Sequence, residues 1–157
     1  MKFQLQKWIH STIIRMFKAK ILIPIKKNTI SLPLFANRVA CGFPSPADDY
    51  LESTIDLNDL LISNVPSTFL IYATGESMIN AGIMDGDILI VDRSLKPKHK
   101  DIIVAIINGD FLVKRLYMQD SKVWLCSENR NFPKIEINSN TNFEIWGVVT
   151  NAIHRLR

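Results

Sequence analysis

The stretch "TFLIYATGESMINAGIMDGDILIVD", residues 68–92, decides the fold, because it sets two short apolar runs on either side of a glycine-containing loop. The runs "TFLIYA" and "DILIVD" are rich in Ile, Leu and Val, residues that favour strands, and turn residues bound them. The loop holds Gly75, Gly82 and Gly86, which indicate tight turns or a close approach of the backbone to another peptide. The stretch therefore predicts two strands joined by a tightly turned loop.

The same pattern continues toward the end of the chain. "DIIVAII", "FLVKRLYM", "KVWLC" and "FEIWGVV" are further runs of strand-forming residues separated by turns. Asn108 and Gly109 both tolerate positive φ, so the runs ending at Ile107 and starting at Asp110 should pair as a hairpin. We expect a mainly β, antiparallel domain over residues 65–157, preceded by a connector over 42–64 that includes a short helix or turn-rich segment.

Charge is unevenly distributed along the 157 residues, of which 47% are hydrophobic, enough for one domain and an appendage. Residues 1–41 carry eight Lys or Arg and no Asp or Glu, which leaves eleven basic and fifteen acidic side chains in the remaining 116 residues. A basic arm thus precedes a mildly acidic body, and such an arm suits nucleic acid or a membrane surface without specifying either. No apolar run reaches the ~18 residues of a membrane span, and Arg15, Lys18 and Lys20 interrupt any stretch that could serve as a secretory segment. We therefore expect a cytoplasmic protein that is not inserted in a membrane.

The sequence contains no motif typical of a metal or cofactor site. The two cysteines, Cys41 and Cys126, are too few for a disulfide framework or a metal site. His10, His99 and His154 show no ligand spacing. We therefore expect neither a metal nor a cofactor.

The stretch "VACGFPSPADDY", residues 39–50, should be extended and exposed, because Pro44 and Pro46 lack backbone donors and restrict the residues before them. One interpretation is a linker between the arm and the domain. The other is a peptide built to be cut, since Cys41 and Gly42 have little bulk around the bond between them. The residues alone leave both open.

Ser77 and Lys114 are the candidate reactive groups. Ser77 lies just past a strand in the glycine-containing loop, where it is either an ordinary turn serine or an exposed nucleophile. Lys114 shares a strand face with Leu112 and Leu116, so it is either an edge-strand lysine that reaches water or a buried amine of lowered pKa. A neutral lysine beside a serine can act as the general base that activates it.

These features together resemble the UmuD proteins, a branch of the LexA-like self-cleaving serine–lysine peptidases. "CGFPSPADDY", "GESM" around Ser77, "FLVKRL" around Lys114 and "SENRNFPKIEI" carry the resemblance, which covers roughly residues 31–157. The resemblance implies a compact LexA- or signal-peptidase-like β domain with a flexible, cleavable N-terminal arm, residues 1–41. It leaves Met1 and Met16 open as translation starts, and residues 1–27 match no part of it.

The resemblance also implies a function. A cytoplasmic SOS-response homodimer would cut its own chain between Cys41 and Gly42 on contact with RecA filaments on single-stranded DNA. The product would serve as subunit of an error-prone translesion DNA polymerase, a UmuC-like Y-family enzyme. Ser77 would attack, Lys114 would be the general base, and the backbone N–H groups of Glu76 and Ser77 would hold the oxyanion.

Three other functions compete with this one. A LexA-like self-cleaving repressor needs a helix-turn-helix, and "NTISLPLFANRV" before the cleavage site offers no pair of amphipathic helices. A signal peptidase needs an apolar anchor, which the sequence lacks. A polymerase accessory protein with a lapsed catalytic pair is disfavoured, because Ser77 and Lys114 are both present.

Overall fold

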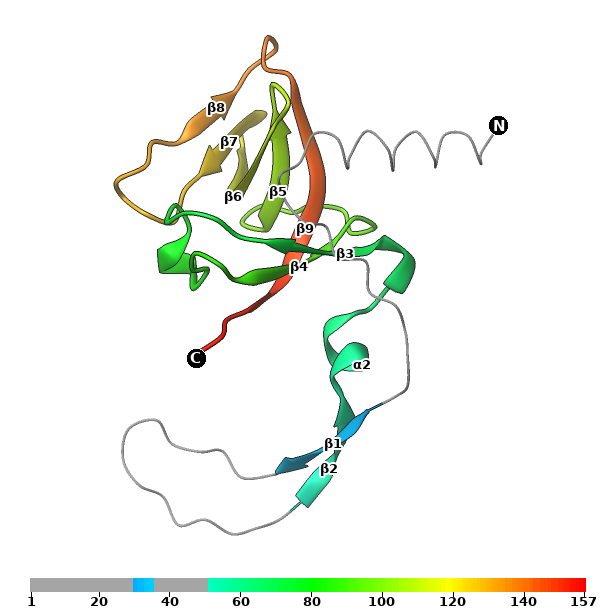
Figure 1. Cartoon of the computed structure of the whole chain (residues 1–157). Helices are drawn as coiled ribbons and strands as arrows, with labels where there is room; N and C mark the ends of the chain where they lie inside the picture. Colours follow the sequence, from blue (N-terminus) through cyan, green and yellow to red (C-terminus); the bar gives the residue numbers. More distant parts are fainter. Residues whose placement is uncertain (1–29, 36–50) are drawn as a thin grey trace. The chain divides into compact units, whose positions relative to one another are not determined.

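The computed structural model describes residues 30–35 and 51–157 (Figure 1). The chain divides into a large unit that includes residues 64–157 and a small unit of residues 25–63, each of which is described by itself. The proposed cleavage site, Cys41 and Gly42, and the extended conformation expected for residues 39–50 lie outside the described residues.

The large unit is an antiparallel β-sheet, as the sequence predicted. Its strands are β3 (Thr68–Tyr72), β4 (Ile88–Asp92), β5 (Ile102–Ile107), β6 (Asp110–Gln119), β7 (Lys122–Cys126), β8 (Ile135–Ile137) and β9 (Phe143–Ile153). They run in the order β3-β4-β9-β5-β6-β7-β8. There are two short 3-10 helices in this unit. Val65–Ser67 directly precedes β3, and Ile79–Ala81 follows Ser77 in the loop between β3 and β4. Each predicted strand is present, and β8 is an additional one.

The predicted hairpin is confirmed. Ile107 pairs with Asp110 at the closed end of β5 and β6. Asn108 and Gly109 form the turn with φ values of 52° and 94°, a region that both residues tolerate. The hairpin fixes the register that places Ile103 opposite Lys114.

Strand β9, orange to red in Figure 1, lies between β4 and β5 and joins the two parts of the sheet. It pairs with β4 on one side and β5 on the other, and the register shifts once along each pairing. Gly147 lies where the strand packs most closely, since a Cβ atom there would sit 2.7 Å from Cγ1 of Val91. Only glycine fits at this crossing without movement of its neighbours.

Both faces of the sheet are buried by apolar side chains. Consecutive residues of β5 point to opposite faces, so Val104 belongs to one cluster and Ile103 to another. The first cluster includes Leu89, Val91 and Trp146. The second includes Leu116 and Leu125, and Leu112 packs against it. Strand β6, which carries Lys114, therefore has a partly buried side on which a polar side chain loses water.

The small unit is a β-hairpin followed by one helix. β1 (Ser31–Phe35) pairs with β2 (Leu51–Asp56), and α2 (Leu57–Leu61) follows at once. Asp56 caps this helix by accepting a hydrogen bond of 2.8 Å from the Asn58 backbone N–H. The short helix predicted within residues 51–64 is present, but a strand that the sequence did not predict precedes it.

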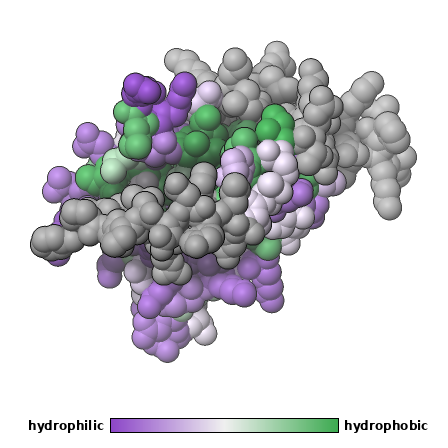
Figure 2. Space-filling model, turned by 90° about the horizontal axis from the view of Figure 1, so that it is seen from below, coloured by the Kyte–Doolittle hydropathy of each residue, from purple (hydrophilic) through white to green (hydrophobic). Residues whose placement is uncertain are grey.

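Several large apolar side chains remain exposed in the large unit. Tyr72 pairs with Ile88, and Ile88 pairs with Ile153, so the three form a row across β3, β4 and β9. Tyr72 is 43% exposed and Ile153 is 39% exposed. Figure 2 shows that hydrophobic residues also gather on the face seen from below. The row reaches an edge of the sheet at Tyr72, because β3 is the outermost strand.

Candidate active site

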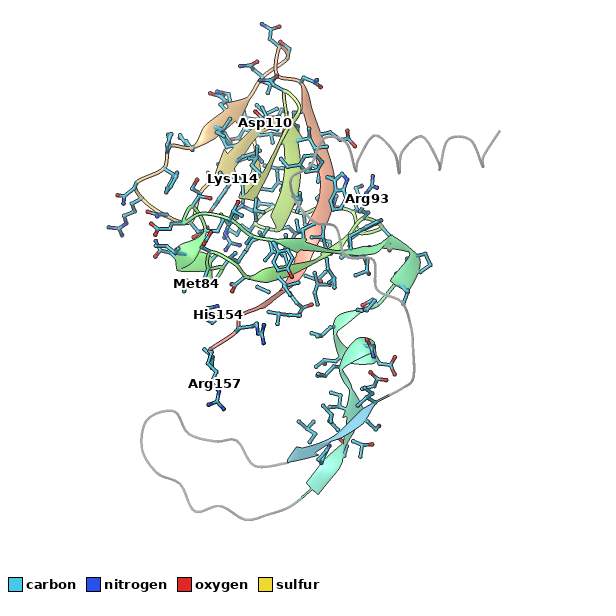
Figure 3. The ribbon with its side chains drawn as sticks, viewed as in Figure 1. Met84, Arg93, Asp110, Lys114, His154 and Arg157 are labelled. Atoms are coloured by element: carbon cyan, nitrogen blue, oxygen red, sulfur yellow. The ribbon has the colours of Figure 1, made fainter. Side chains whose placement is uncertain are left out.

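The structure brings Ser77 and Lys114 into contact. The Nζ atom of Lys114 lies 2.8 Å from Oγ of Ser77, to which it donates a hydrogen bond. It also donates to the carbonyl oxygen of Val113 at 3.1 Å. Lys114, labelled in Figure 3, comes from β6, whereas Ser77 comes from the loop between β3 and β4. Two segments that are distant in sequence thus meet at one polar point.

The surroundings of Lys114 favour its neutral form. Its side chain is half-buried, and burial lowers its pKa below the ordinary value for lysine. Leu116, on the same face of the strand, is fully buried. None of the ion pairs between described residues includes Lys114, so no carboxylate among them compensates for the lost hydration. The structure supports burial over an edge-strand lysine that reaches water.

Hydrogen bonds between its two ends close the loop that carries Ser77. Ala73 donates to the carbonyl oxygen of Asp87 at 2.8 Å, and Gly86 donates back to Ala73 at 2.9 Å. The Gly75 N–H donates to Oδ1 of Asp85 at 2.6 Å. These bonds close the loop on itself, so the residues around Ser77 have a fixed frame.

Asp87 links this loop to the end of the chain. Only 2% of Asp87 is exposed; its Oδ2 accepts from the Met84 N–H and its Oδ1 lies 2.7 Å from Nδ1 of His154. Burial acts to raise the pKa of Asp87, but the Met84 N–H and His154 outweigh it and leave the pKa lowered. His154 and Met84 are labelled in Figure 3. The ionised carboxylate holds the far end of the loop against the residues after β9.

A second segment, after β7, braces the loop on both sides of Ser77. Nδ2 of Asn129 donates to the carbonyl oxygen of Glu76 at 2.9 Å. The Asn80 N–H donates to the carbonyl oxygen of Glu128, also at 2.9 Å. The sequence did not identify Glu128 or Asn129 as residues of the site. Each contact has a backbone carbonyl oxygen as its acceptor, and such an atom leaves no signal in the residue type.

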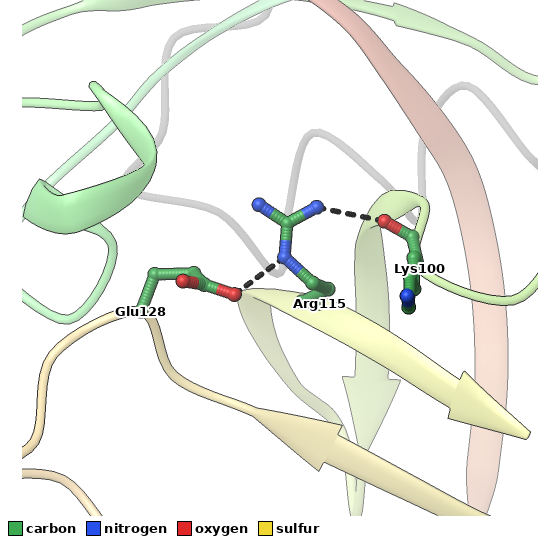
Figure 4. A network of polar contacts seen from close by, with 3 residues as sticks. All are labelled: Lys100, Arg115 and Glu128. Atoms are coloured by element: carbon green, nitrogen blue, oxygen red, sulfur yellow. Dashed lines mark hydrogen bonds and ion pairs between the residues drawn. The ribbon is translucent and has the colours of Figure 1, made fainter.

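Arg115 connects the same segment to the lysine strand. Its guanidinium forms an ion pair with the Glu128 carboxylate and donates to the Lys100 carbonyl oxygen at 2.7 Å (Figure 4). Arg115 directly follows Lys114, so the residues that carry the serine and the lysine are joined through Glu128. The two reactive groups therefore share one polar framework.

No metal centre is evident in residues 30–35 and 51–157, where no three His, Cys, Asp or Glu side chains gather as ligands. Cys126 is a free thiol whose pKa is raised, chiefly by burial. Within the same ranges, no helix is long and apolar enough to cross a membrane.

A β-sheet domain with a serine hydroxyl hydrogen-bonded to a half-buried lysine defines a class, that of the serine-peptidase-type hydrolases. The family model described as Peptidase S24-like matches residues 33–150. The chain belongs to this family, which confirms the LexA/UmuD-like relationship expected from the sequence.

Three relatives illustrate the match. Protein ImpA of Salmonella typhimurium is 46% identical over 125 residues, which cover 80% of this chain and 85% of that protein. Protein MucA of Escherichia coli is 39% identical over 124 residues, 78% of this chain and 84% of MucA. A LexA repressor of an Acidovorax species is 36% identical over 124 residues, which cover 79% of this chain but 54% of the repressor.

Proposed function

We propose that this chain is a UmuD-like SOS-response protein that cuts itself between Cys41 and Gly42. The observation that carries the proposal is the 2.8 Å contact between the Lys114 amine and the Ser77 hydroxyl, because it joins a nucleophile to a base of lowered pKa. Membership of the Peptidase S24-like family supports it.

The chemistry needs only groups of this chain and water. Oγ of Ser77 attacks the carbonyl carbon of Cys41 while the neutral Lys114 amine takes the hydroxyl proton. As the C–N bond breaks, Lys114 returns that proton to the leaving amine of Gly42. A water molecule, deprotonated by Lys114, then hydrolyses the acyl ester and frees the Cys41 carboxylate and the Ser77 hydroxyl.

The negative charge of the tetrahedral intermediate needs hydrogen-bond donors. Within the described residues, neither the Glu76 nor the Ser77 N–H donates a hydrogen bond, so both are free to bind the oxyanion. A single such donor typically contributes about 3 kcal/mol to a transition state. The two backbone N–H groups thus take the role that the resemblance implies.

The partners follow from the same proposal. RecA filaments on single-stranded DNA would trigger the cut in the cytoplasm, and the product would join a Y-family polymerase of the UmuC type in translesion synthesis. The row of Tyr72, Ile88 and Ile153 supports a homodimer, because it includes the exposed apolar side chains of Tyr72 and Ile153, and such side chains favour a partner surface.

A self-cleaving repressor of the LexA type is the less favoured function. The LexA repressor of Acidovorax shares lower identity with this chain than ImpA does, 36% against 46%. The aligned part covers 54% of the repressor and 85% of ImpA. Similarity along most of a protein's length supports the UmuD-like function more directly.

Cleavage should give one new C-terminal fragment that begins at Gly42. Full-length protein incubated with RecA, ATP and single-stranded DNA is analysed by intact-mass spectrometry and N-terminal sequencing. Omission of the DNA is the control, since it removes the filament. A fragment that begins at another residue contradicts the proposed bond, and an uncut chain contradicts the proposed function.

The cut form should bind a Y-family polymerase and support synthesis past damaged bases better than the uncut form. Cleavage removes an arm with eight basic and no acidic residues, so the charge of the protein changes from +4 to −4. Pull-down and primer extension on a damaged template compare a chain that starts at Gly42 with a full-length Ser77→Ala chain, which should stay uncut. Equal lesion bypass by the two contradicts a cleavage switch.

A further inference from the structure

We propose that Asn129 is a positioning residue that aims the Ser77 N–H at the oxyanion. The inference rests on the proposed function and extends it to a residue outside the reactive pair. Asn129 touches neither Ser77 Oγ nor Lys114 in any of its hydrogen bonds between described residues. It acts through the carbonyl oxygen of Glu76.

The peptide bond between Glu76 and Ser77 connects the Asn129 contact to the N–H that would bind the oxyanion. Its carbonyl oxygen and its N–H lie in one plane and point in opposite directions, because the bond is planar and trans. Nδ2 of Asn129 holds that carbonyl oxygen at 2.9 Å. Fixing the oxygen therefore fixes the direction of the Ser77 N–H on the other side of the plane.

The same hydrogen bond strengthens the donor. A carbonyl that accepts a hydrogen bond draws charge across the peptide group, so its N–H becomes a better donor. The other hydrogen bond to the Glu76 oxygen comes from the Ile79 N–H at 3.4 Å, which is long for a backbone bond. Asn129 is thus the main constraint on this peptide plane.

Asn129 is itself held in place. Its Oδ1 accepts from the Asn131 N–H at 3.1 Å, which fixes the amide so that Nδ2 faces Glu76. The preceding residue, Glu128, is tied to Arg115 on the lysine strand. A donor supported in this way keeps its direction while the tetrahedral intermediate forms.

Two substitutions separate this role from a general effect on folding. Asn129→Asp keeps the size of the side chain and the acceptor for the Asn131 N–H, but it removes the donor to Glu76. Asn129→Ala removes both. Asn131→Ala is the matched control, because Asn131 takes part in the described hydrogen bonds only through its backbone.

The test measures the first-order rate of RecA-independent self-cleavage of the full chain from about pH 6 to 10. Both Asn129 variants should lower the plateau rate by about tenfold to a hundredfold, somewhat less than the loss of an oxyanion donor itself. The pH of half-maximal rate should stay unchanged in Asn129→Ala, because this substitution adds no charge near Lys114. Asn131→Ala should match the wild type.

Three outcomes would overturn the inference: a wild-type rate for Asn129→Asp, a shift in the midpoint of the Asn129→Ala profile, or an equal loss in Asn131→Ala. Failure of the proposed function is seen separately, as continued cleavage by Ser77→Ala. A second readout does not need cleavage. In a Lys114→Ala background, Asn129→Asp should move the amide resonance of Ser77 in a ¹⁵N–¹H spectrum, and an unmoved resonance also overturns the inference.

Discussion

Replacing Ser77 by alanine should abolish the proposed self-cleavage, a fall in rate of on the order of 10⁴-fold or more. The reason is that Ser77 supplies the only oxygen placed 2.8 Å from the Lys114 amine, so no other group among the described residues can form the acyl intermediate at that point. The rate is followed on gels, with RecA filaments and separately at alkaline pH.

The fold should survive this substitution, because Ser77 is a loop residue whose main-chain neighbours hold the loop independently of its hydroxyl. Thermal unfolding and the oligomeric state check this. Ser139→Ala, in an exposed turn, is the matched control and should cleave normally. Cleavage by Ser77→Ala at a normal rate would show that another residue is the nucleophile.

Self-cleavage without RecA should accelerate as pH rises and level off above the lowered pKa of Lys114. The rate rises with pH because only the neutral amine accepts a proton. Burial lowers the pKa of Lys114, so the neutral form is reached at lower pH than in free lysine. RecA should raise the rate most near neutral pH, where few molecules hold a neutral lysine.

Lys114→Arg should be inactive across the whole range, again a loss of on the order of 10⁴-fold, because a guanidinium stays charged. Lys122→Arg is the control, since Lys122 is a largely exposed lysine on the neighbouring strand β7. A flat pH profile, or cleavage by Lys114→Arg at high pH, would remove Lys114 from the mechanism.

The strands were predictable where their signal is local. "DILIVD" and "KVWLC" contain enough Ile, Val and Leu to identify β4 and β7 without knowledge of their partners. β8 has three residues, too few for a pattern, and β1 contains Pro33, which ordinarily argues against a strand. Those elements depend on pairing with a distant segment, which a sequence pattern does not report.

For the candidate site too, the sequence identified individual residues but not the contacts between distant segments. Ser77 and Lys114 were identified as candidates from the sequence, because a serine in a glycine-containing loop and a lysine between leucines are visible as residue types. Their contact, and the bracing by Glu128 and Asn129, depend on how β6 and the segment after β7 fold beside the loop. Interactions through backbone carbonyls carry no signature in composition or spacing.

The position of β9 has a consequence for the timing of synthesis. The hairpin β3–β4 carries the serine loop, the hairpin β5–β6 carries the lysine, and in the sheet order only β9 joins them. Because β9 follows all the other strands in the chain, the nascent chain cannot assemble this sheet until every strand has been synthesised. On the proposed function, the peptidase would in this way stay inactive during synthesis of its strands, because the serine loop and the lysine strand are joined only once β9 is present.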